Sequence, residues 1–310
     1  MGQSALWAVT SYFNPMRYRR RRENFHIFRR QLGIPLLAVE LSFDGSFELD
    51  QGDADILVRL EGGDVMWQKE RLLEIGVRRL PVECNRVACL DCDIQFGRAD
   101  WSARACKLLE RYPMVQPFSR VNYLRRDWSP GEDLHAGTEF TMPSVAFAAS
   151  TEGNLAFLED PGLHGRGTAS NGFAWVFRRA LIERHGMYTA CIIGGGDAAL
   201  VCAAWGDPEI VVRRHTMNEH QERCYRDWAQ AFNAAVQGRV GYVDEEVFHL
   251  WHGSLGDRQA RERHLALRQF EFDPLKDLAL DASGCWRWNS DKPRLHAYLR
   301  DYFAARREDG

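Results

Sequence analysis

Residues 88–96 of the chain have the sequence "ACLDCDIQF". Most of it is apolar and typical of a buried strand, yet it carries two carboxylates, Asp91 and Asp93. Residues i and i+2 of a strand point to the same face, so we expect these two side chains to lie side by side. Adjacent anions repel each other, and burying them is costly without a cation or hydrogen-bond donors. The sequence therefore raises the question of what compensates the two aspartates.

Apolar strands alternate with amphipathic helices around this stretch. We expect strands at 5–13, 35–43, 54–60 and 86–96, and helices at 16–32, 65–80 and near 99–112. This alternation predicts a three-layer α/β domain, Rossmann-like, with a mostly parallel central sheet. Such sheets bind ligands at the carboxyl ends of their strands, which is where Asp91 and Asp93 are expected.

The second half of the chain has fewer clear signals. "FAWVFRRALIERHG" (173–186) predicts a helix with a glycine stop, and "CIIGGGDAALVCAAWG" (191–206) predicts a glycine turn leading into a helix. Further helices are expected at 218–238 and near 292–308, and a strand end within 243–253. No repeat or low-complexity linker interrupts the chain. We therefore predict one domain over residues 1–268, followed by a C-terminal helical extension over residues 269–310.

Composition is that of an ordinary globular protein. The 310 residues are 45% hydrophobic and 27% charged, and the net charge of −3 demands neither a nucleic acid nor a membrane as partner. No signal peptide and no stretch long enough to span a membrane are evident, which predicts a cytoplasmic protein. The eight cysteines are scattered, and the pair Cys89 and Cys92 lacks the second pair that a zinc site needs.

Two groups of residues have the chemistry of a divalent metal site. Asp91 and Asp93 offer the oxygen ligands that Mg²⁺ or Mn²⁺ prefers, and the alternative is a pair of capping or surface aspartates. His249 and His252 in "VFHLWHG" (247–253) could add nitrogen ligands, which would favour Mn²⁺ over Ca²⁺. Packed histidines that donate to backbone carbonyls are the alternative there.

Three single residues raise further hypotheses. Asp197 follows three glycines at the start of an apolar helix, and it is either a general base or a helix cap. Arg21 falls on the apolar stripe of the first helix and needs an anion, either a nucleotide or an internal carboxylate. Glu40, inside "LLAVELSF" (36–43), could accept hydrogen bonds from a ribose or a base.

The order of these blocks resembles a known family. "TSYFNP" (10–15), "WQKERLLEIG" (67–76), "LDCDIQF" (90–96), "NGFAWVFRRALIERHG" (171–186), "GGGD" (194–197) and "HLWHG" (249–253) resemble GT-A fold glycosyltransferases of bacteria and phages. A more distant resemblance is to metal-dependent inverting galactosyl- and N-acetylgalactosaminyltransferases. The likeness covers about residues 6–265, and it implies the GT-A form of the three-layer domain.

The resemblance implies a role for each matching residue. Asp93 would be the direct metal ligand and Asp91 would serve the sugar and ribose side, with His252 as the first further ligand and His249 as the second. In "GGGD", Gly195 and Gly196 would line the donor site, and Gly196 stands where the family has a second acid, which leaves Asp197 as the base. The remaining matches are Gly172 and Trp175 for the sugar and acceptor site, Lys69 and Arg71 for the nucleotide, and Tyr12, Phe13 and Asn14 for the base.

The resemblance also implies an activity. The chain would be a glycosyltransferase of the hexosyltransferase type that uses Mn²⁺ or Mg²⁺ and a nucleotide-sugar donor, expected to be a UDP-sugar, and inverts the anomeric centre. The acceptor could be a glycan, a lipid-linked glycan, a protein or the hydroxymethylated bases of DNA. Alternatives are a nucleotidyltransferase, for which we find no glycine-rich nucleotide loop near the first strand, and a non-catalytic sugar-nucleotide-binding protein. The basic run "RYRRRR" (17–22) could suggest nucleic acid, but the net charge favours a solvated helix face.

Overall fold

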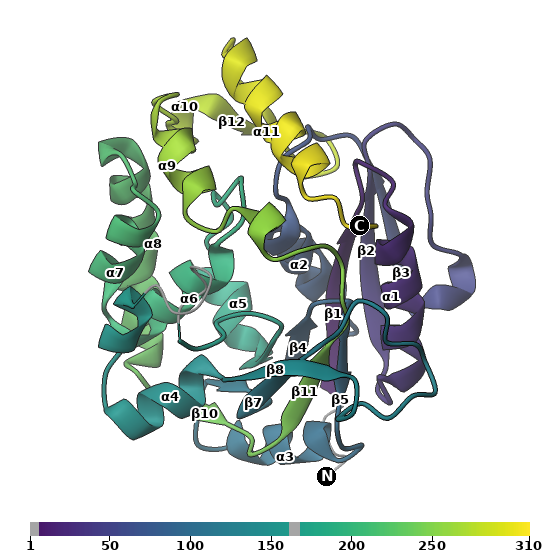
Figure 1. The fold of residues 1–310 in the computed structure, drawn as a ribbon. Helices are drawn as coiled ribbons and strands as arrows, with labels where there is room; N and C mark the ends of the chain where they lie inside the picture. Colours follow the sequence, from purple (N-terminus) through teal and green to yellow (C-terminus); the bar gives the residue numbers. More distant parts are fainter. Residues whose placement is uncertain (1–5, 161–167) are drawn as a thin grey trace.

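A seven-stranded sheet forms the centre of the computed structural model, which describes residues 6–160 and 168–310 (Figure 1). In spatial order its strands are β10 (Val240–Tyr242), β6 (Met114–Gln116), β9 (Ala174–Arg178), β4 (Arg86–Leu90), β1 (Leu6–Phe13), β2 (Leu36–Ser42) and β3 (Ile56–Glu61). All neighbours are parallel except β9, which runs antiparallel to both β4 and β6. The prediction of an α/β fold with a mostly parallel central sheet is confirmed.

A second sheet stands beside the end of the first. Its four strands are β5 (Ile94–Phe96), β11 (Glu246–His249), β7 (Arg120–Leu124) and β8 (Thr138–Pro143). The single strand predicted over 86–96 is therefore wrong: β4 belongs to the first sheet, β5 to the second, and residues 91–93 form the turn between them. Asp91 and Asp93 do lie at the carboxyl end of a buried strand, but they do not share one strand face.

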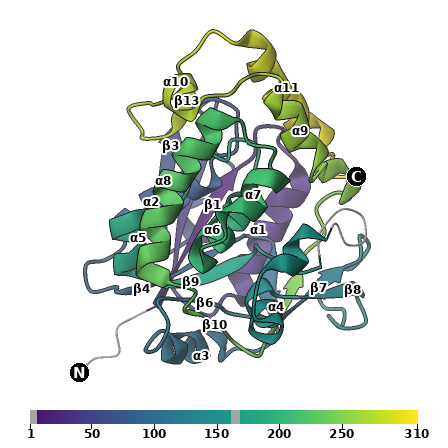
Figure 2. The ribbon, with the colours of Figure 1, turned by 90° about the vertical axis from the view of Figure 1, so that its left-hand side faces the viewer.

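Helices cover both faces of the central sheet and make the fold three-layered. On one face the core joins Val9, Leu37 and Val39 to apolar residues of α2, α5, α6 and α8, and on the other it joins Ala8 and Tyr12 to α1 and α3. Figures 1 and 2 show this arrangement from two directions. The helices are α1 (Arg19–Gln31), α2 (Lys69–Arg78), α3 (Trp101–Leu108), α4 (Val145–Glu152), α5 (Arg179–His185), α6 (Gly196–Trp205), α7 (Pro208–Arg214), α8 (Glu219–Val236), α9 (Glu262–Arg268), α10 (Pro274–Asp277) and α11 (Pro293–Ala305).

One predicted helix is partly a strand. Residues 173–186 were expected to be helical throughout, whereas residues 174–178 form β9 and only Arg179–His185 form α5. The β-branched and aromatic side chains Trp175, Val176 and Phe177 suit a central strand, and pairing with β4 and β6 satisfies the backbone there. The glycine turn and helix predicted over 191–206 are present: α6 begins directly after Gly195 and ends at Trp205.

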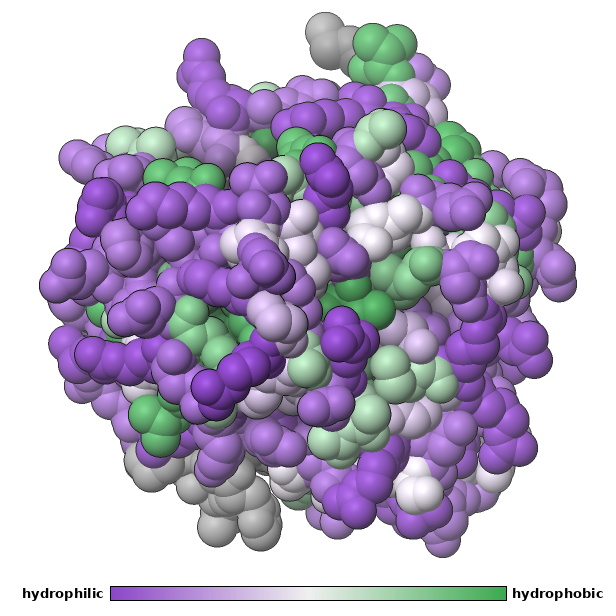
Figure 3. Space-filling view, turned by 90° about the horizontal axis from the view of Figure 1, so that it is seen from above, coloured by the Kyte–Doolittle hydropathy of each residue, from purple (hydrophilic) through white to green (hydrophobic). Residues whose placement is uncertain are grey.

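The segment after residue 268 returns to the main domain. It forms α10, a small hairpin of β12 (Leu278–Leu280) and β13 (Trp286–Trp288), and α11. Leu295, Leu299 and Phe303 of α11 are buried in the core that also holds Val9, so this segment is packed against the domain. The boundary at 268/269 stays a prediction. The face seen from above, over which α11 lies, is mostly hydrophilic with scattered apolar residues (Figure 3).

None of the helices within 6–160 and 168–310 has the length and apolarity needed to cross a bilayer. The eight cysteines are free thiols, five of them buried. Cys89 is buried and Cys92 is half-buried.

Candidate active site

A cavity of about 290 Å³ opens at the carboxyl ends of β1 and β4. It gathers side chains from the first sheet, the second sheet and the segment 249–264, which lie far apart in the sequence. Ten of the residues singled out from the sequence line it: Phe13, Arg21, Lys69, Asp91, Asp93, Gly172, Gly195, Asp197, His249 and His252. The fold thus brings the two aspartates, the two histidines and the candidate base into one space.

Asp93, His249 and His252 form a candidate metal centre. Their ligand atoms all lie within 4.8 Å of one another. The Asp93 Oδ2 atom is 3.0 Å from the His252 Nε2 atom, which is 3.1 Å from the His249 Nε2 atom. A backbone hydrogen bond from Leu250 N–H to the Asp93 carbonyl (2.8 Å) ties the turn after β4 to the end of β11 and so sets this proximity.

The donor set of this cluster fits Mn²⁺ better than Mg²⁺, which prefers oxygen ligands. One carboxylate and two imidazoles suit a first-row divalent cation, and two nitrogens favour Mn²⁺ over Ca²⁺. The Asp93 Oδ1 atom is buried and has no hydrogen-bond partner in the described chain, so a ligand position is free. Burial alone would raise the pKa of Asp93, but the neighbouring His252 and His249 outweigh burial and lower that pKa, which keeps the carboxyl ionised for a cation.

Lys69 compensates the other aspartate. Its ammonium lies 2.6 Å from Asp91 Oδ1 and 3.0 Å from Asp197 Oδ2, and it is largely buried at the first turn of α2. Burial alone would lower the pKa of Lys69, but Asp197 and Asp91 outweigh it and raise that pKa well above its usual value. Burial raises the pKa of Asp91 to about 6, against the opposing effect of Lys69. The two aspartates of the opening stretch are therefore compensated separately, Asp91 by Lys69 and Asp93 by the histidines.

Asp197 lies in the first turn of α6 but does not cap the helix. No side-chain hydrogen bond caps α6, whose N-cap residue is Gly195, and the Asp197 carboxylate accepts from Lys69 instead. A Cβ at Gly172 would lie 3.0 Å from Asp197 Oδ2, so the glycine lets the backbone pass close to the carboxylate. The structure thus does not support the hypothesis of a cap, and Asp197, which lines the cavity, stays a predicted base.

Glu70 is a buried carboxyl beside this pair. A Cβ built on Gly196 would come within 2.1 Å of Glu70 Oε1, so the missing side chain at 196 makes room for Glu70. Glu70 Oε1 is buried without a hydrogen-bond partner in the described chain, and burial raises the pKa of Glu70 to about 8. Gly196 itself does not line the main cavity, contrary to its expected place in the donor site.

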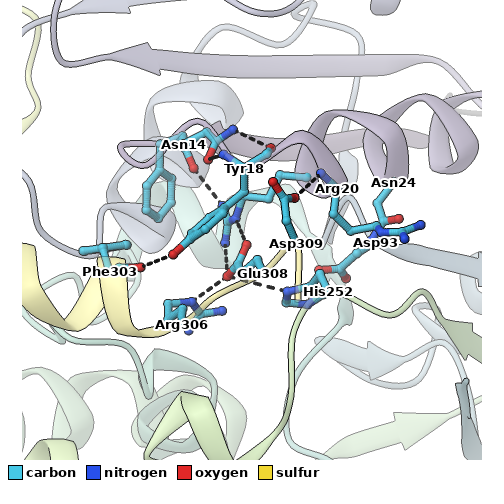
Figure 4. Close-up of polar contacts among 12 residues, drawn as sticks. Asn14, Tyr18, Arg20, Asn24, Asp93, His252, Phe303, Arg306, Glu308 and Asp309 are labelled. Carbon is cyan, nitrogen blue, oxygen red and sulfur yellow. Dashed lines mark hydrogen bonds and ion pairs between the residues drawn. The ribbon is translucent and has the colours of Figure 1, made fainter. Parts of the chain in front are cut away.

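Glu308 joins the first helix to the metal side of the cavity. It accepts from Arg21 Nε (2.5 Å) and Arg306 Nε (2.5 Å), and lies 3.6 Å from His252 Nδ1 (Figure 4). Burial alone would raise the pKa of Glu308, but Arg21 and Arg306 lower it well below its usual value. The anion that Arg21 requires is therefore an internal carboxylate in this structure, although Arg21 also lines the cavity.

Glu40, Tyr12 and Asn14 do not line the cavity, which corrects their expected places around a nucleotide. The Glu40 carboxylate is buried and accepts from the backbone N–H groups of Glu48 (2.5 Å) and Leu49 (3.1 Å). Tyr12 and Asn14 both donate to Glu48. These hydrogen bonds fix the loop after β2. Glu40 Oε2 is buried without a hydrogen bond and lies 3.7 Å from Arg59 Nε.

Arg71 and Trp175 are also absent from the lining of the main cavity. Arg71 donates to the carbonyl of Gly284 (2.6 Å) and to Glu74 (3.0 Å), so it holds α2 to the C-terminal segment. The Trp175 indole donates to the carbonyl of Asn171 (2.9 Å) and is buried. Both side chains are therefore engaged in contacts within the protein, outside the lining of the main cavity.

Sequence reasoning missed several cavity residues. Four of them form what we call the Arg–His wall, namely Arg214, His215, Arg263 and His264; the others include Trp67, Arg258 and Arg306. The density of arginine and histidine over 252–264 was the available signal for the later ones. Nothing local distinguishes Arg214 or Arg306 from the exposed arginines beside them.

The basic run 17–22 is largely paired with acids. Arg17 pairs with Asp44 (2.7 Å), and Arg19 and Arg20 lie near Glu23 (3.4 and 3.7 Å). This pairing agrees with the interpretation of the run as a solvated helix face.

Comparison with known proteins gave similarity of structure only. No family model matches the sequence, and no curated protein does. Similar solved structures include glucosyl-3-phosphoglycerate synthase from Mycobacterium tuberculosis with Mn²⁺, UDP and phosphoglyceric acid (11% identity, 95% of this chain and 91% of that one, TM-score 0.42). Others are TarS residues 1–349 from S. aureus (8%, 97% and 71%, 0.38) and the catalytic domain of Drosophila β1,4-galactosyltransferase 7 with xylobiose (10%, 95% and 98%, 0.36). Solved structures similar to this chain thus include GT-A glycosyltransferases, the class that its sequence blocks resemble.

Proposed function

We propose that this chain is a metal-dependent glycosyltransferase that moves a sugar from a UDP-sugar to an acceptor hydroxyl with inversion. The observation that carries the proposal is the convergence of Asp93, His249, His252 and Asp197 on one cavity at the carboxyl ends of parallel strands. Open α/β sheets bind nucleotides at such an edge. The sequence blocks quoted above support the same assignment.

The donor is assigned to the side of the cavity that Phe13, Trp67 and the metal centre line. Phe13 and Trp67 meet edge to face with ring centroids 5.5 Å apart, and both line the cavity. An aromatic wall of this kind suits a nucleobase. Asp93, His249 and His252 would hold Mn²⁺ or Mg²⁺, which when bound would neutralise charge on the departing nucleoside diphosphate.

Asp197 is assigned as the general base. Its carboxylate accepts the proton of the acceptor hydroxyl while the hydroxyl oxygen attacks the anomeric carbon. The bond between that carbon and the diphosphate oxygen breaks, and its electron pair leaves with the nucleoside diphosphate. Attack in line with the leaving group inverts the anomeric centre. Lys69 orients the base, because its ammonium contacts both Asp197 and Asp91.

The experiment is a screen of UDP-, GDP- and CDP-sugars for hydrolysis that depends on Mn²⁺, followed by a comparison of Asp197→Asn with Asp207→Asn. Both aspartates begin a helix, but Asp207 does not line the cavity, so the second variant controls for an effect on a helix terminus. We expect Asp197→Asn to lower turnover by about a hundredfold or more, the scale of general base catalysis, with unchanged UDP binding.

Two results would contradict the proposal. A wild-type protein that binds UDP and Mn²⁺ but turns over no sugar nucleotide would be a binding protein. An Asp197→Asn variant that transfers or hydrolyses at near the parent rate would remove Asp197 from catalysis.

A further inference from the structure

The Arg–His wall carries positive charge that no acid of the described chain neutralises. Arg263 donates to the Tyr302 hydroxyl (2.6 Å), the Arg258 carbonyl (3.4 Å) and the His264 imidazole (3.4 Å), and to no carboxylate. Within 6–160 and 168–310, no ion pair or side-chain hydrogen bond involves Arg214. Arg21 and Arg306, on the metal side of the same cavity, share Glu308. Arg214 and Arg263 therefore face the cavity without the internal anion that Arg21 and Arg306 have. Arg258, which contacts His252, pairs with no carboxylate of the described chain either.

The two histidines of the wall add neutral hydrogen-bonding groups. The rings of His215 and His264 stack in parallel with centroids 3.9 Å apart, and both are buried. Burial lowers the pKa of each well below its usual value, so both are neutral imidazoles at physiological pH. A neutral imidazole can donate one hydrogen bond without adding charge.

The wall packs directly on the glycine turn that precedes Asp197. A Cβ at Gly195 would lie 2.5 Å from His215 Cε1 and 3.2 Å from His264 Cε1. A Cβ at Gly194 would lie 3.4 Å from the Arg263 guanidinium. The wall is therefore adjacent to the candidate base, whereas Arg258 contacts His252 of the metal centre at 2.9 Å.

Favourable interaction with a helix terminus does not by itself explain why both Arg214 and Arg263 line the cavity. Arg214 ends α7, where a cation interacts favourably with the backbone carbonyls, but Arg263 is in the first turn of α9, where a cation does not. Burial lowers the pKa of Arg214, as expected for a cation that lacks a counter-ion. Guanidinium groups bind phosphate and carboxylate groups through charge-assisted hydrogen bonds.

We propose that the Arg–His wall binds an anionic group, a phosphate or a carboxylate, carried by the acceptor close to the hydroxyl that reacts. The anion site follows from the wall itself, and its assignment to the acceptor rests on the proposed function. The acceptor class would then be a phosphorylated or acidic sugar or a comparable small acid, since a neutral glycan offers no negative charge to Arg214 and Arg263.

The test measures binding of inorganic phosphate by calorimetry, with and without saturating UDP and Mg²⁺. Arg214→Gln and Arg263→Gln remove the cations. Arg268→Gln is the matched control, because Arg268 is exposed, lies in the same helix α9 as Arg263, and lines neither this cavity nor the neighbouring cavity that Arg214 shares with Arg261. We expect wild type and control to bind phosphate equally in both conditions. Each wall variant should weaken phosphate binding by about ten- to a hundredfold and leave UDP affinity unchanged.

A second arm separates the two sources of the anion. UDP-glucuronic acid is compared with UDP-glucose as donor, and glucose 6-phosphate with glucose as a ligand of the UDP-saturated protein. A loss confined to glucose 6-phosphate in the wall variants supports the acceptor. A loss confined to UDP-glucuronic acid assigns the anion to the donor sugar and overturns that part of the proposal.

Three further results would overturn the anion site. The first is that the wall variants bind phosphate with the wild-type affinity, and the second is that the wild type binds no phosphate. The third is that UDP displaces phosphate from the wild type and that both wall variants lose affinity for UDP. The last would assign the wall to the donor diphosphate. If Arg263→Gln does not fold, Arg214→Gln alone decides, because it removes the other cation of the wall. A protein that binds no UDP would refute the proposed function, whereas phosphate binding to the nucleotide-free protein would still decide the anion site.

Discussion

Replacing Lys69 by methionine should destabilise the fold, because the Lys69 ammonium is the cation that holds two carboxylates together. Its Nζ atom is 2.6 Å from Asp91 and 3.0 Å from Asp197, and the lysine side chain is 11% exposed. Removing one partner of a buried ion pair typically costs about 3–5 kcal/mol. The two aspartate side chains are 25% and 31% exposed, so water recovers part of that cost. We therefore expect the free energy of unfolding of Lys69→Met to fall by about 3 kcal/mol at pH 8.

The measurement is urea unfolding followed by fluorescence, with Lys107→Met as control. Lys107 is an exposed lysine of α3, and its replacement should change stability by less than about 0.5 kcal/mol. Adding Asp91→Asn to Lys69→Met should recover stability, since one of the stranded carboxylates is then neutral. The loss should also shrink toward pH 5, below the pKa of about 6 to which burial raises Asp91. A loss below about 1 kcal/mol, or no recovery in the double variant, would refute this account of Lys69.

Three further perturbations test other parts of the site. His252→Ala should weaken Mn²⁺ binding at least about tenfold by calorimetry, whereas the exposed His135→Ala should not, and equal affinities would remove His252 from the metal centre. The pKa of Glu70 rises from 4.5 to about 8 on folding, so the folded state holds a proton that the unfolded state releases between these values. Wild-type stability should therefore fall as pH rises through that window, by up to about 1.4 kcal/mol per pH unit, and Glu70→Gln should flatten the slope in chemical unfolding at a series of pH values. Gly195→Ala should cost about 1–3 kcal/mol more than Gly153→Ala in the same assay. Both glycines have positive φ, but only at Gly195 would the new Cβ meet a buried ring; equal costs would contradict that contact.

The elements that follow period and composition could be predicted from the sequence. The parallel strands β1, β2, β3 and β4 and the helices α1, α2, α6 and α8 appeared close to their expected places, because each has a strong apolar pattern and clear stop signals. The strand β9 was taken for the start of a helix, since "AWVF" is apolar throughout and only its antiparallel neighbours decide its form. The break between β4 and β5 also has no local signal. The two strands belong to different sheets, and only tertiary contacts decide which sheet each strand joins.

Within the site, the candidate metal ligands could be selected from the sequence by residue type alone. Asp93, His249 and His252 offer metal ligands by type, and the fold brings them together. Glu40 was assigned to a nucleotide because an acid in a strand needs partners, but backbone N–H groups of its own loop supply them. Glu308 had no local signal, because its contacts with Arg21 and His252, both distant in the sequence, give it a part in the site.

The contact between Arg21 and Glu308 makes the order of chain synthesis matter for this cavity. The two residues are 287 positions apart, and a ribosome that adds about 5–20 residues per second needs on the order of 15–60 s to bridge them. Closing so long a loop in an unfolded chain costs about 5 kcal/mol of entropy, so the contact forms only once the sheet has brought both segments close. A nascent chain that has already folded its sheet therefore presents Arg21 without its counter-ion. The charge balance on the metal side of the cavity should thus be established after the bulk of the secondary structure has formed.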